Sequence, residues 1–401
     1  MKVFKRIIAG AGASGLMFAA LSEKTDGLII DRSCNPGLKL LLSGSGQCNI
    51  THGGSIKDFI DKYGESGRII RPLLYKASNV AMMQFIESLG VPLTERSDGK
   101  VFPKSMKASD VLKALLSKSN ENGYSLRLNE EITAIDCGEV FTVTTNRNTY
   151  KAEKLIIACG GKSYPKTGSD GSIFSIISEL GIHVTELLPS LTPIYIHGYK
   201  YRECSGVSFK NAEISVYDKN SLVCRNKDDL LLTHRAFSGP AVINISRYIS
   251  PGMTLKVKYV KYDIKETENI IKADFQTSSK EVRTYITKKF RLPASFTEAL
   301  LKENGINPSL KTSSLEGEQI ITICRALTES TYEISGRGSF AEAMVTQGGV
   351  CLDEINIKTM ESLKYKNLYF IGEVLNIDGD TGGYNLQFAF SSASAANKDM
   401  D

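Results

Sequence analysis

A glycine-rich turn between an apolar strand and a helix constrains the fold of this chain more than any other feature. The strand is expected over residues 3–9, the helix over residues 14–24, and the turn that joins them reads G-x-G-x-x-G. Gly10 permits a tight turn, Gly12 lets the backbone approach a diphosphate, and Gly15 lets the helix pack closely on the strand. The N–H groups at the start of such a helix point at an anionic phosphate. The pattern predicts a nucleotide-binding βαβ unit.

A second apolar strand, expected over residues 28–31, ends in the acid that such a unit requires. Asp31 follows Gly10 by 21 residues (31 − 10), the spacing at which a carboxylate accepts a hydrogen bond from a ribose hydroxyl. A carboxylate in this place disfavours a ribose 2′-phosphate, which leaves FAD or NAD as the dinucleotide. The alternative is a glycine turn that only packs a helix on a strand, with Asp31 as a cap.

A glycine-rich loop after the second strand distinguishes FAD from NAD as the expected dinucleotide. Residues 34–54 are rich in Gly, Ser and Asn and show neither helical nor strand periodicity. An NAD dehydrogenase needs no such loop here, whereas a flavin is buried along its length and needs wrapping. In this interpretation Ser43 and Asn49 donate hydrogen bonds, Lys39 balances phosphate charge, and Cys48 is inert. A surface loop without a ligand is the alternative.

The C-terminal part of the chain shows the same order of strand, glycine turn and helix. A strand is expected over residues 368–371, Gly372 follows it, and a helix begins near Gly383. The positive end of that helix favours the negative charge that a flavin ring acquires on reduction. Glu373 and Asp378 lie in the acidic loop between them, either as ligands of ribitol hydroxyls or as solvated acids of a turn. The sequence thus predicts that the two ends of the chain meet around one cofactor.

The composition is that of an ordinary globular protein of two or three domains. The 401 residues are 42% hydrophobic and 23% charged, and the formal net charge is +5. All of that excess lies in residues 256–291, where ten Lys and Arg stand against five Asp and Glu, as a solvated helical face or a patch for an anionic partner. The eight cysteines form no C-x-x-C pair, which favours reduced thiols in a cytoplasmic protein. We expect no membrane segment and no signal peptide.

The middle of the chain differs in pattern from both ends. Short β-rich segments begin near residue 189, and helical periodicity prevails from 263 to 330. After residue 344 the chain returns to strand, glycine turn and helix. This order predicts that the middle is inserted into the N-terminal domain.

Six sequence blocks, taken in order, carry a resemblance to a known family. They are GAGASGL, PGLKLLLSGSGQCNIT, ACGGKSYPKTGSDG, LLTHRAFSGPAV, AMVTQGGV with EINIKTMES, and LYFIGEVLNIDGDTGGYNLQFAFSSA. The blocks span nearly the whole chain, which resembles the BaiN-like (YhiN-like, aminoacetone-oxidase-type) FAD-dependent flavoproteins. The resemblance implies an α/β fold, in which a glutathione-reductase-like FAD-binding Rossmann domain is interrupted by a β-barrel-like domain that carries a small helical subdomain. The three domains are expected at residues 1–188 with 336–401, at 189–262 with 316–335, and at 263–315.

The same resemblance implies the cofactor contacts. The residues expected to contact FAD are Gly10, Gly12, Ala13, Ser14, Gly15, Asp31, Arg32, Lys39, Leu40, Ser43, Gly46, Cys48, Asn49, Ile132, Ala158, Gly160, Gly372, Glu373, Asp378, Gly383, Tyr384, Asn385 and Leu386. Two positions depart from the family pattern, because Gln47 stands where a basic residue is common and Asn376 where an aspartate is usual. Both departures bear on flavin electronics and on substrate polarity.

Catalytic residues are less defined than the cofactor site. His234, in the block LLTHRAFSGPAV, is the best candidate for a group that faces the flavin, and a histidine that bonds backbone at a domain junction is an equal alternative. No metal site is expected, since a flavin carries hydride or electrons itself. We therefore expect an FAD-dependent oxidoreductase that works between a small organic substrate and either NAD(P)H, bound transiently, or oxygen. The alternatives are a flavin-bearing protein that binds or modifies RNA, although nucleic acid is not the expected partner, and an NAD-only dehydrogenase.

Overall fold

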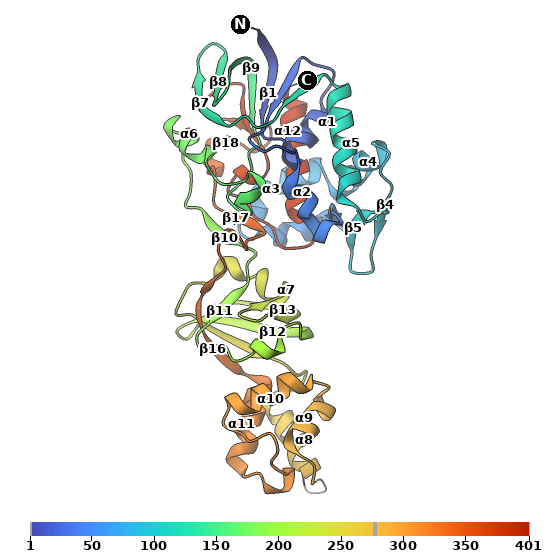
Figure 1. The fold of residues 1–401 in the computed structure, drawn as a ribbon, viewed down its shortest axis with the longest axis vertical. Helices are drawn as coiled ribbons and strands as arrows, with labels where there is room; N and C mark the ends of the chain where they lie inside the picture. The colour runs from blue at the N-terminus through green and yellow to red at the C-terminus, as the bar shows by residue number, and fades with distance from the viewer. Residues whose placement is uncertain (1, 276–278, 401) are drawn as a thin grey trace. The chain divides into compact units, whose positions relative to one another are not determined.

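The computed structural model describes residues 2–275 and 279–400. The chain divides into two compact units, of which the first comprises Met1–Ser190 and Ala343–Asp401 and the second comprises Leu191–Glu342. The elements of both are labelled in Figure 1. Within the described residues, no helix is both long and apolar enough to cross a bilayer.

The first unit is built on a nine-stranded sheet with a parallel core. The parallel strands, in spatial order, are β20 (Leu368–Phe370), β9 (Thr149–Ile157), β1 (Val3–Ala9), β2 (Gly27–Ile30) and β6 (Tyr124–Arg127). Four antiparallel strands extend it, namely β7 (Ile132–Cys137), β8 (Phe141–Thr145), β18 (Ile355–Asn356) and β19 (Glu361–Ser362). The ends of β1 and β9 and all of β20 are runs of buried residues, as expected for a parallel sheet covered on both faces.

Helices from both ends of the chain cover this sheet together. α1 (Ala13–Leu21) has seven buried residues out of nine and packs against both α12 (Tyr384–Met400) and α5 (Ala108–Glu121). A helix that is apolar on all sides must lie inside the structure. The close packing of α1 on α12, visible in Figure 1, confirms that the two ends of the chain meet.

Shorter elements complete the first unit. They are α2 (Leu38–Leu42), α3 (Ser66–Lys76), α4 (Asn79–Ser88), α6 (Ile173–Glu179), a small sheet of β3 (Thr51–His52), β5 (Lys100–Pro103) and β4 (Leu93–Glu95), and the pair β10 (Leu188–Ser190) with β17 (Val345–Gln347). The segment before α2 reaches the end of β1, because the Gly37 N–H donates to the carbonyl oxygen of Ala11 at 2.9 Å.

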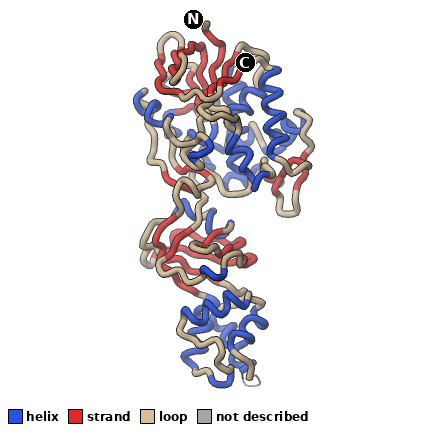
Figure 2. The backbone as a smooth tube through the Cα atoms, in the orientation of Figure 1, coloured by secondary structure: helices blue, strands red, loops and turns tan. Residues whose placement is uncertain are grey.

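The second unit contains a closed barrel of six strands, shown in red in Figure 2. Around the barrel these are β11 (Ile194–Ile196), β14 (Phe237–Ser238), β13 (Ser221–Leu232), β12 (Ser208–Asp218), β15 (Thr254–Lys258) and β16 (Ser330–Arg337). Alternate apolar residues such as Ile214, Leu255 and Val257 are fully buried, the pattern of strands with one face toward a core. The expected β-barrel-like insert is therefore confirmed.

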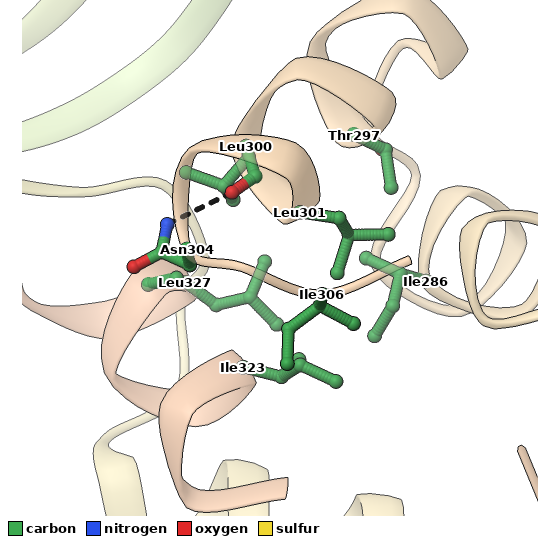
Figure 3. Close-up of a pocket in the computed structure, with 9 residues that line it drawn as sticks. Ile286, Thr297, Leu300, Leu301, Asn304, Ile306, Ile323 and Leu327 are labelled. Atoms are coloured by element: carbon green, nitrogen blue, oxygen red, sulfur yellow. Dashed lines mark hydrogen bonds between the residues drawn. The ribbon is translucent and has the colours of Figure 1, made fainter. Parts of the chain in front are cut away.

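Helices fill the chain between β15 and β16. They are α8 (Ile264–Phe275), α9 (Val282–Phe290), α10 (Ala294–Glu303) and α11 (Gly317–Thr328), so the helical run extends past residue 315. A pocket among them is lined by Ile286, Leu301, Ile306 and Ile323 with neighbouring apolar side chains (Figure 3). Its lining also includes Asn304, whose side-chain N–H donates to the carbonyl oxygen of Leu300 at 2.8 Å. The pocket is therefore core packing without polar groups directed at a ligand.

Candidate cofactor site

The candidate site lies where the parallel strands of the first unit end. The chain runs from β1 to β2 and β6 on one side and returns with β9 and β20 on the other, so β1 and β9 flank the point where the strand order reverses. Ligands of open α/β sheets bind at such a point, outside the carboxyl ends of the strands. Gly10 directly follows β1, Ala158 directly follows β9, and Gly372 lies two residues after the end of β20. A Cβ added at Gly372 would lie 2.5 Å from the Ser14 hydroxyl oxygen, so the last strand touches the start of α1.

The glycines of the first turn have two different roles. Gly10 has φ +108°, and a Cβ there would lie 2.5 Å from the carbonyl oxygen of Ala158. A Cβ at Gly15 would collide with the carbonyl oxygen of Gly10, so both glycines are required by the packing of the protein itself. Gly12 has φ −83° and no protein atom nearer to such a Cβ than Ala158 O at 4.0 Å. Its open side, at the N-terminus of α1, fits the diphosphate of a dinucleotide.

Asp31 holds this turn in shape. One carboxylate oxygen accepts the N–H of Ala11 at 2.7 Å, and the other accepts the N–H of Ser33 at 2.8 Å. A carboxylate has about four acceptor positions, so two remain for ribose hydroxyls. Arg32 points instead at acids, because its guanidinium hydrogen-bonds Asp170 and lies 3.5 Å from a carboxylate oxygen of Glu131. Partial burial lowers the pKa of Arg32, but the hydrogen bond and charge of Asp170 outweigh this and raise it above its ordinary value.

The loop after α2 has an unusual backbone. Gly44, Ser45, Gly46 and Cys48 all have φ between +55° and +85°. A left-handed conformation costs a residue with a side chain free energy, and such residues gather at ligand sites. Cys48 is fully buried, and burial raises the pKa of its thiol to about 11. The thiol is therefore protonated at neutral pH, which supports an inert Cys48.

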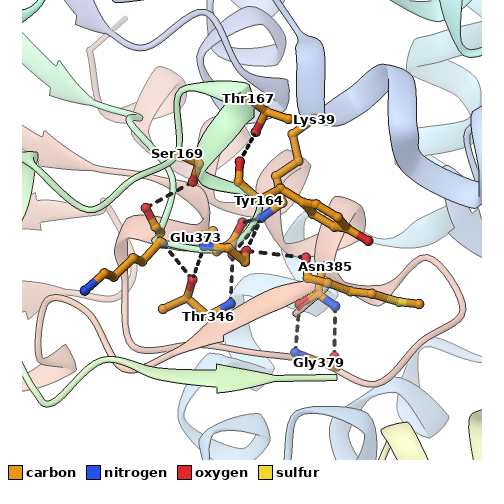
Figure 4. Close-up of polar contacts among 12 residues, drawn as sticks. Lys39, Tyr164, Thr167, Ser169, Thr346, Glu373, Gly379 and Asn385 are labelled. Atoms are coloured by element: carbon orange, nitrogen blue, oxygen red, sulfur yellow. Dashed lines mark hydrogen bonds and ion pairs between the residues drawn. The ribbon is translucent and has the colours of Figure 1, made fainter. Parts of the chain in front are cut away.

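Lys39 and Glu373 form the centre of a polar network that joins four segments (Figure 4). The Lys39 ammonium donates to the two Glu373 carboxylate oxygens at 2.6 and 2.9 Å, and it also donates to the Ser163 hydroxyl. Glu373 Oε1 accepts the Ser163 hydroxyl and the Thr346 N–H, each at 2.9 Å. The Thr346 hydroxyl oxygen accepts the N–H groups of Lys162 and Ser163 at 2.7 and 3.0 Å. The ends of β9 and β20, the strand β17 and helix α2 are thus tied together.

The start of α12 is held by amide side chains. Asn385 accepts the N–H of Gly379 and donates to its carbonyl oxygen, both at 2.8 Å, which fixes the acidic loop. The Asn49 side-chain oxygen, with the amide oriented to satisfy both ends, accepts the N–H of Gly383 at 3.2 Å. The next N–H groups, those of Tyr384, Asn385 and Leu386, have no partner within the helix and favour negative charge near them. Burial raises the pKa of Tyr384 to about 12, so its hydroxyl stays protonated at neutral pH.

Comparisons with known proteins agree with this geometry. The family model described as the HI0933-like protein Rossmann domain matches residues 4–399. The chain belongs to the HI0933-like family.

Curated relatives of this HI0933-like protein match almost from end to end. The ribosomal RNA dihydrouridine synthase of Escherichia coli is 30% identical, over 100% of this chain and 98% of the relative. The 3-dehydro-bile acid delta(4,6)-reductase of Clostridium scindens is 27% identical, over 98% and 97%. Among solved structures, the 3-ketosteroid delta1-dehydrogenase of Sterolibacterium denitrificans shares the fold with a TM-score of 0.52 at 12% identity, over 100% of this chain and 99% of that chain. The protein is an FAD-dependent oxidoreductase, and the alternative of an NAD-only dehydrogenase is wrong.

Other expected contacts of the HI0933-like protein lie around the same strand ends, and their contact with FAD stays a prediction. Gly160 has φ +74°, and a Cβ there would lie 2.9 Å from the Ser169 hydroxyl oxygen. Asp378 accepts the Ser190 hydroxyl at 2.7 Å. The remaining ones are Ala13 in the first turn of α1, Leu40 in α2, Ser43, whose hydroxyl donates to Leu40 O at 2.6 Å, and Ile132 at the start of β7.

His234 lies in the second unit of the HI0933-like protein. It is exposed in the turn between β13 and β14, next to Arg235, which forms an ion pair with Glu342 at 2.8 Å. Its role toward a flavin therefore stays a prediction. Sequence reasoning missed Ser163 and Thr346, the partners of Glu373, although both lie in the blocks that carry the family resemblance.

Proposed function

We propose that this protein reduces a carbon–carbon double bond conjugated to a carbonyl group, with hydride from a flavin that NAD(P)H reduces. The names of its relatives support one common chemistry. A dihydrouridine synthase saturates the C5–C6 bond of uracil, which is conjugated to the C4 carbonyl, and a delta(4,6)-reductase acts on double bonds conjugated to a 3-oxo group. Both substrates contain a conjugated system whose far carbon can accept hydride.

The observation that carries the proposal is the set of strand-end residues in the first unit. FAD, when bound, supplies the hydride chemistry. The open side of Gly12 leaves room for the diphosphate, and Asp31 has acceptor positions left for a ribose. The first turn of α12 favours negative charge, which is the form of a reduced flavin ring. The Lys39–Glu373 ion pair holds the surrounding segments together, and its two charges cancel.

Anaerobic stopped-flow absorbance tests the proposal. FAD-loaded protein is mixed with NADPH or NADH, and the loss of the flavin band near 450 nm is followed. The reduced protein is then mixed with a 3-oxo-4,6-diene bile acid, with a uridine-containing ribosomal RNA fragment, or with oxygen. We expect bleaching by one nicotinamide and faster return of the band with a conjugated substrate than with oxygen. A flavin that oxygen alone reoxidises would contradict the proposal and favour an oxidase.

A uridine in ribosomal RNA is a second candidate substrate, favoured by the distribution of charge. The first unit has 27 Lys and Arg and 27 Asp and Glu, while the second has 22 against 17, so the whole excess of 22 − 17 = +5 lies there. Among its helices, three acids are neutralised by neighbours, in the pairs Lys272–Glu268 at 2.6 Å, Lys289–Asp274 at 2.7 Å and Lys302–Glu298 at 2.6 Å. Within residues 256–291, the exposed cations for which the described residues provide no ion pair include Lys256, Lys261, Lys265, Lys288 and Arg291.

Salt dependence separates this candidate from a small substrate. Binding of a ribosomal RNA fragment through phosphates should weaken steeply between 50 and 200 mM salt, by about 0.7 in the log–log slope for each phosphate contacted on a single strand. Lys288→Glu with Arg291→Glu should flatten that slope, while turnover of a bile acid should not change. Binding that is indifferent to salt would exclude RNA as the substrate.

A further inference from the structure

We propose that Arg96 binds an oxyanion of the substrate, a carboxylate or a phosphate, beside the cofactor loop. The inference rests on the proposed function, because it names a chemical group on the substrate that the flavin would reduce. It concerns the first unit alone, and it assigns to that unit a recognition residue that the cofactor site does not include.

The Arg96 side chain is held on two sides. Arg96 directly follows β4, in the hairpin that leads to β5. Its guanidinium carbon lies 4.0 Å from the centre of the Phe102 ring, and its Nη2 donates to the Gln47 side-chain oxygen at 2.6 Å. Phe102 is 3% exposed, so the surface on which the guanidinium stacks is itself fixed. An arginine ordered in this way loses little rotamer entropy when it binds a ligand.

Both partners of Arg96 belong to the cofactor loop or pack against it. Gln47 immediately precedes Cys48, and Asn49 bonds the N–H of Gly383 at the start of α12. On the other side of the loop, a Cβ added at Gly44 would lie 3.2 Å from the Phe102 ring edge. The guanidinium therefore lies against the loop that reaches the helix end expected at the flavin ring.

No carboxylate among the described residues neutralises the charge of Arg96. Among the described residues, no acidic side chain lies within 4.0 Å of it. The nearby Asp98 is paired with Lys100 at 2.8 Å, and its hydrogen bond from Lys100 lowers its pKa. A guanidinium has five N–H donors in a planar fork, of which the Arg96 Nη2 group donates to Gln47 and to the Met106 sulfur at 3.7 Å. The exposed remainder matches the two oxygens of a carboxylate or phosphate.

Paired ligands that differ only in charge test this role. Flavin absorbance is titrated at equilibrium with a 3-oxo-4,6-diene bile acid and its methyl ester, and with uridine 5′-phosphate and uridine. In Arg96→Gln we expect the Kd of the charged member of one pair to rise about tenfold, with that of its neutral member unchanged. The pair that responds tells whether the oxyanion is a carboxylate or a phosphate. Lys113→Gln, on the exposed face of α5, is the control and should change neither.

A purely structural role gives a different result. If Arg96 only clamps the loop, the Kd of charged and neutral ligands rises equally, and the inference is overturned; an unchanged Kd for every ligand overturns it as well.

Chemical modification gives a measurement that does not depend on turnover. Inorganic phosphate or acetate should slow the reaction of phenylglyoxal with Arg96, followed by mass spectrometry, and should leave the exposed Arg68 unaffected. Lack of protection argues against an oxyanion site even where the reductase activity is found, and protection without that activity argues against the proposed function alone.

Discussion

Gly12→Ala should separate cofactor binding from folding. Gly12 has backbone angles that alanine adopts, and its added Cβ would have no protein atom closer than 4.0 Å. The free protein should therefore nearly keep its stability, because the gain of about 0.4–1 kcal/mol from a stiffer unfolded chain offsets a loss of about 0.5–1 kcal/mol when alanine replaces glycine at a helix N-cap. The methyl group, however, occupies the side on which the diphosphate is expected. Weakening even one charge-assisted hydrogen bond there, worth about 1.5–3 kcal/mol, raises the Kd of FAD about 10- to 100-fold.

Gly15→Ala is the matched control for that experiment. Its Cβ would collide with the carbonyl oxygen of Gly10 and approach the Ala158 Cβ to 3.3 Å. Overpacking of this kind costs about 1–3 kcal/mol of stability, so this variant should unfold earlier even without FAD. Gly12→Ala should thus weaken FAD binding without loss of stability, whereas Gly15→Ala should lower the stability of the cofactor-free protein.

Two measurements on each variant decide the matter. Urea unfolding of the cofactor-free proteins, followed by circular dichroism, gives the stability, and quenching of FAD fluorescence gives the Kd. Wild-type affinity for FAD in Gly12→Ala would mean that the diphosphate does not lie at this turn. A loss of more than about 2 kcal/mol in the cofactor-free Gly12→Ala protein would mean that Gly12 is a packing glycine like Gly15.

Three further predictions follow from buried and paired groups. Iodoacetamide at pH 8 should label the exposed Cys34 of the native protein at least about 100-fold faster than Cys48, whose pKa is raised to about 11 by burial, and equal rates by mass spectrometry would contradict this. A double-mutant cycle of Lys39→Met and Glu373→Gln should give a coupling energy of about 1 kcal/mol, since the 2.6 Å pair is about one quarter exposed; additive losses in urea unfolding would refute the pairing. Burial also raises the pKa of Glu303 above 4.5, so the folded protein holds this proton more firmly than the unfolded chain. Stability should therefore fall as the pH rises above about 4.5 through the folded pKa, and Glu303→Gln should flatten that slope in unfolding measured from pH 4.5 to 8.

Local patterns predicted the parts of the site that local sequence builds. The glycine turn was predictable because strand, turn and helix are consecutive, and the structure places β1 and α1 within a few residues of the expected ranges. The C-terminal strand and helix were predictable for the same reason, with β20 at Leu368–Phe370 and α12 from Tyr384. In the middle of the chain the pattern predicted only β-rich segments, and the family resemblance implied the barrel; the structure joins β12 to β13 by a hairpin turn in which Lys219 has φ +53°.

Contacts between distant segments could not be read from such patterns. Glu373 lies 334 residues from Lys39, and its carboxylate is shared with Ser163 and the N–H of Thr346. Sequence spacing carries no information about which of several acids in a loop faces a given lysine. Arg96 shows the same limit, because its partner Gln47 is 49 residues away, and the two meet where β3 and β4 both pair with β5.

The network around Glu373 also changes how an acid in a cofactor loop should be interpreted. An acid of this loop was expected to accept ribitol hydroxyls, but three protein groups already donate to the Glu373 carboxylate. These groups make four hydrogen bonds, two of them from Lys39, so the roughly four acceptor positions of the carboxylate are already occupied. Its larger contribution is to join the end of β20 to α2, to β17 and to the end of β9, the segments that surround the expected ring. Loss of this carboxylate should therefore loosen all four of these segments, whereas loss of a residue that only touches the ligand would leave their contacts intact.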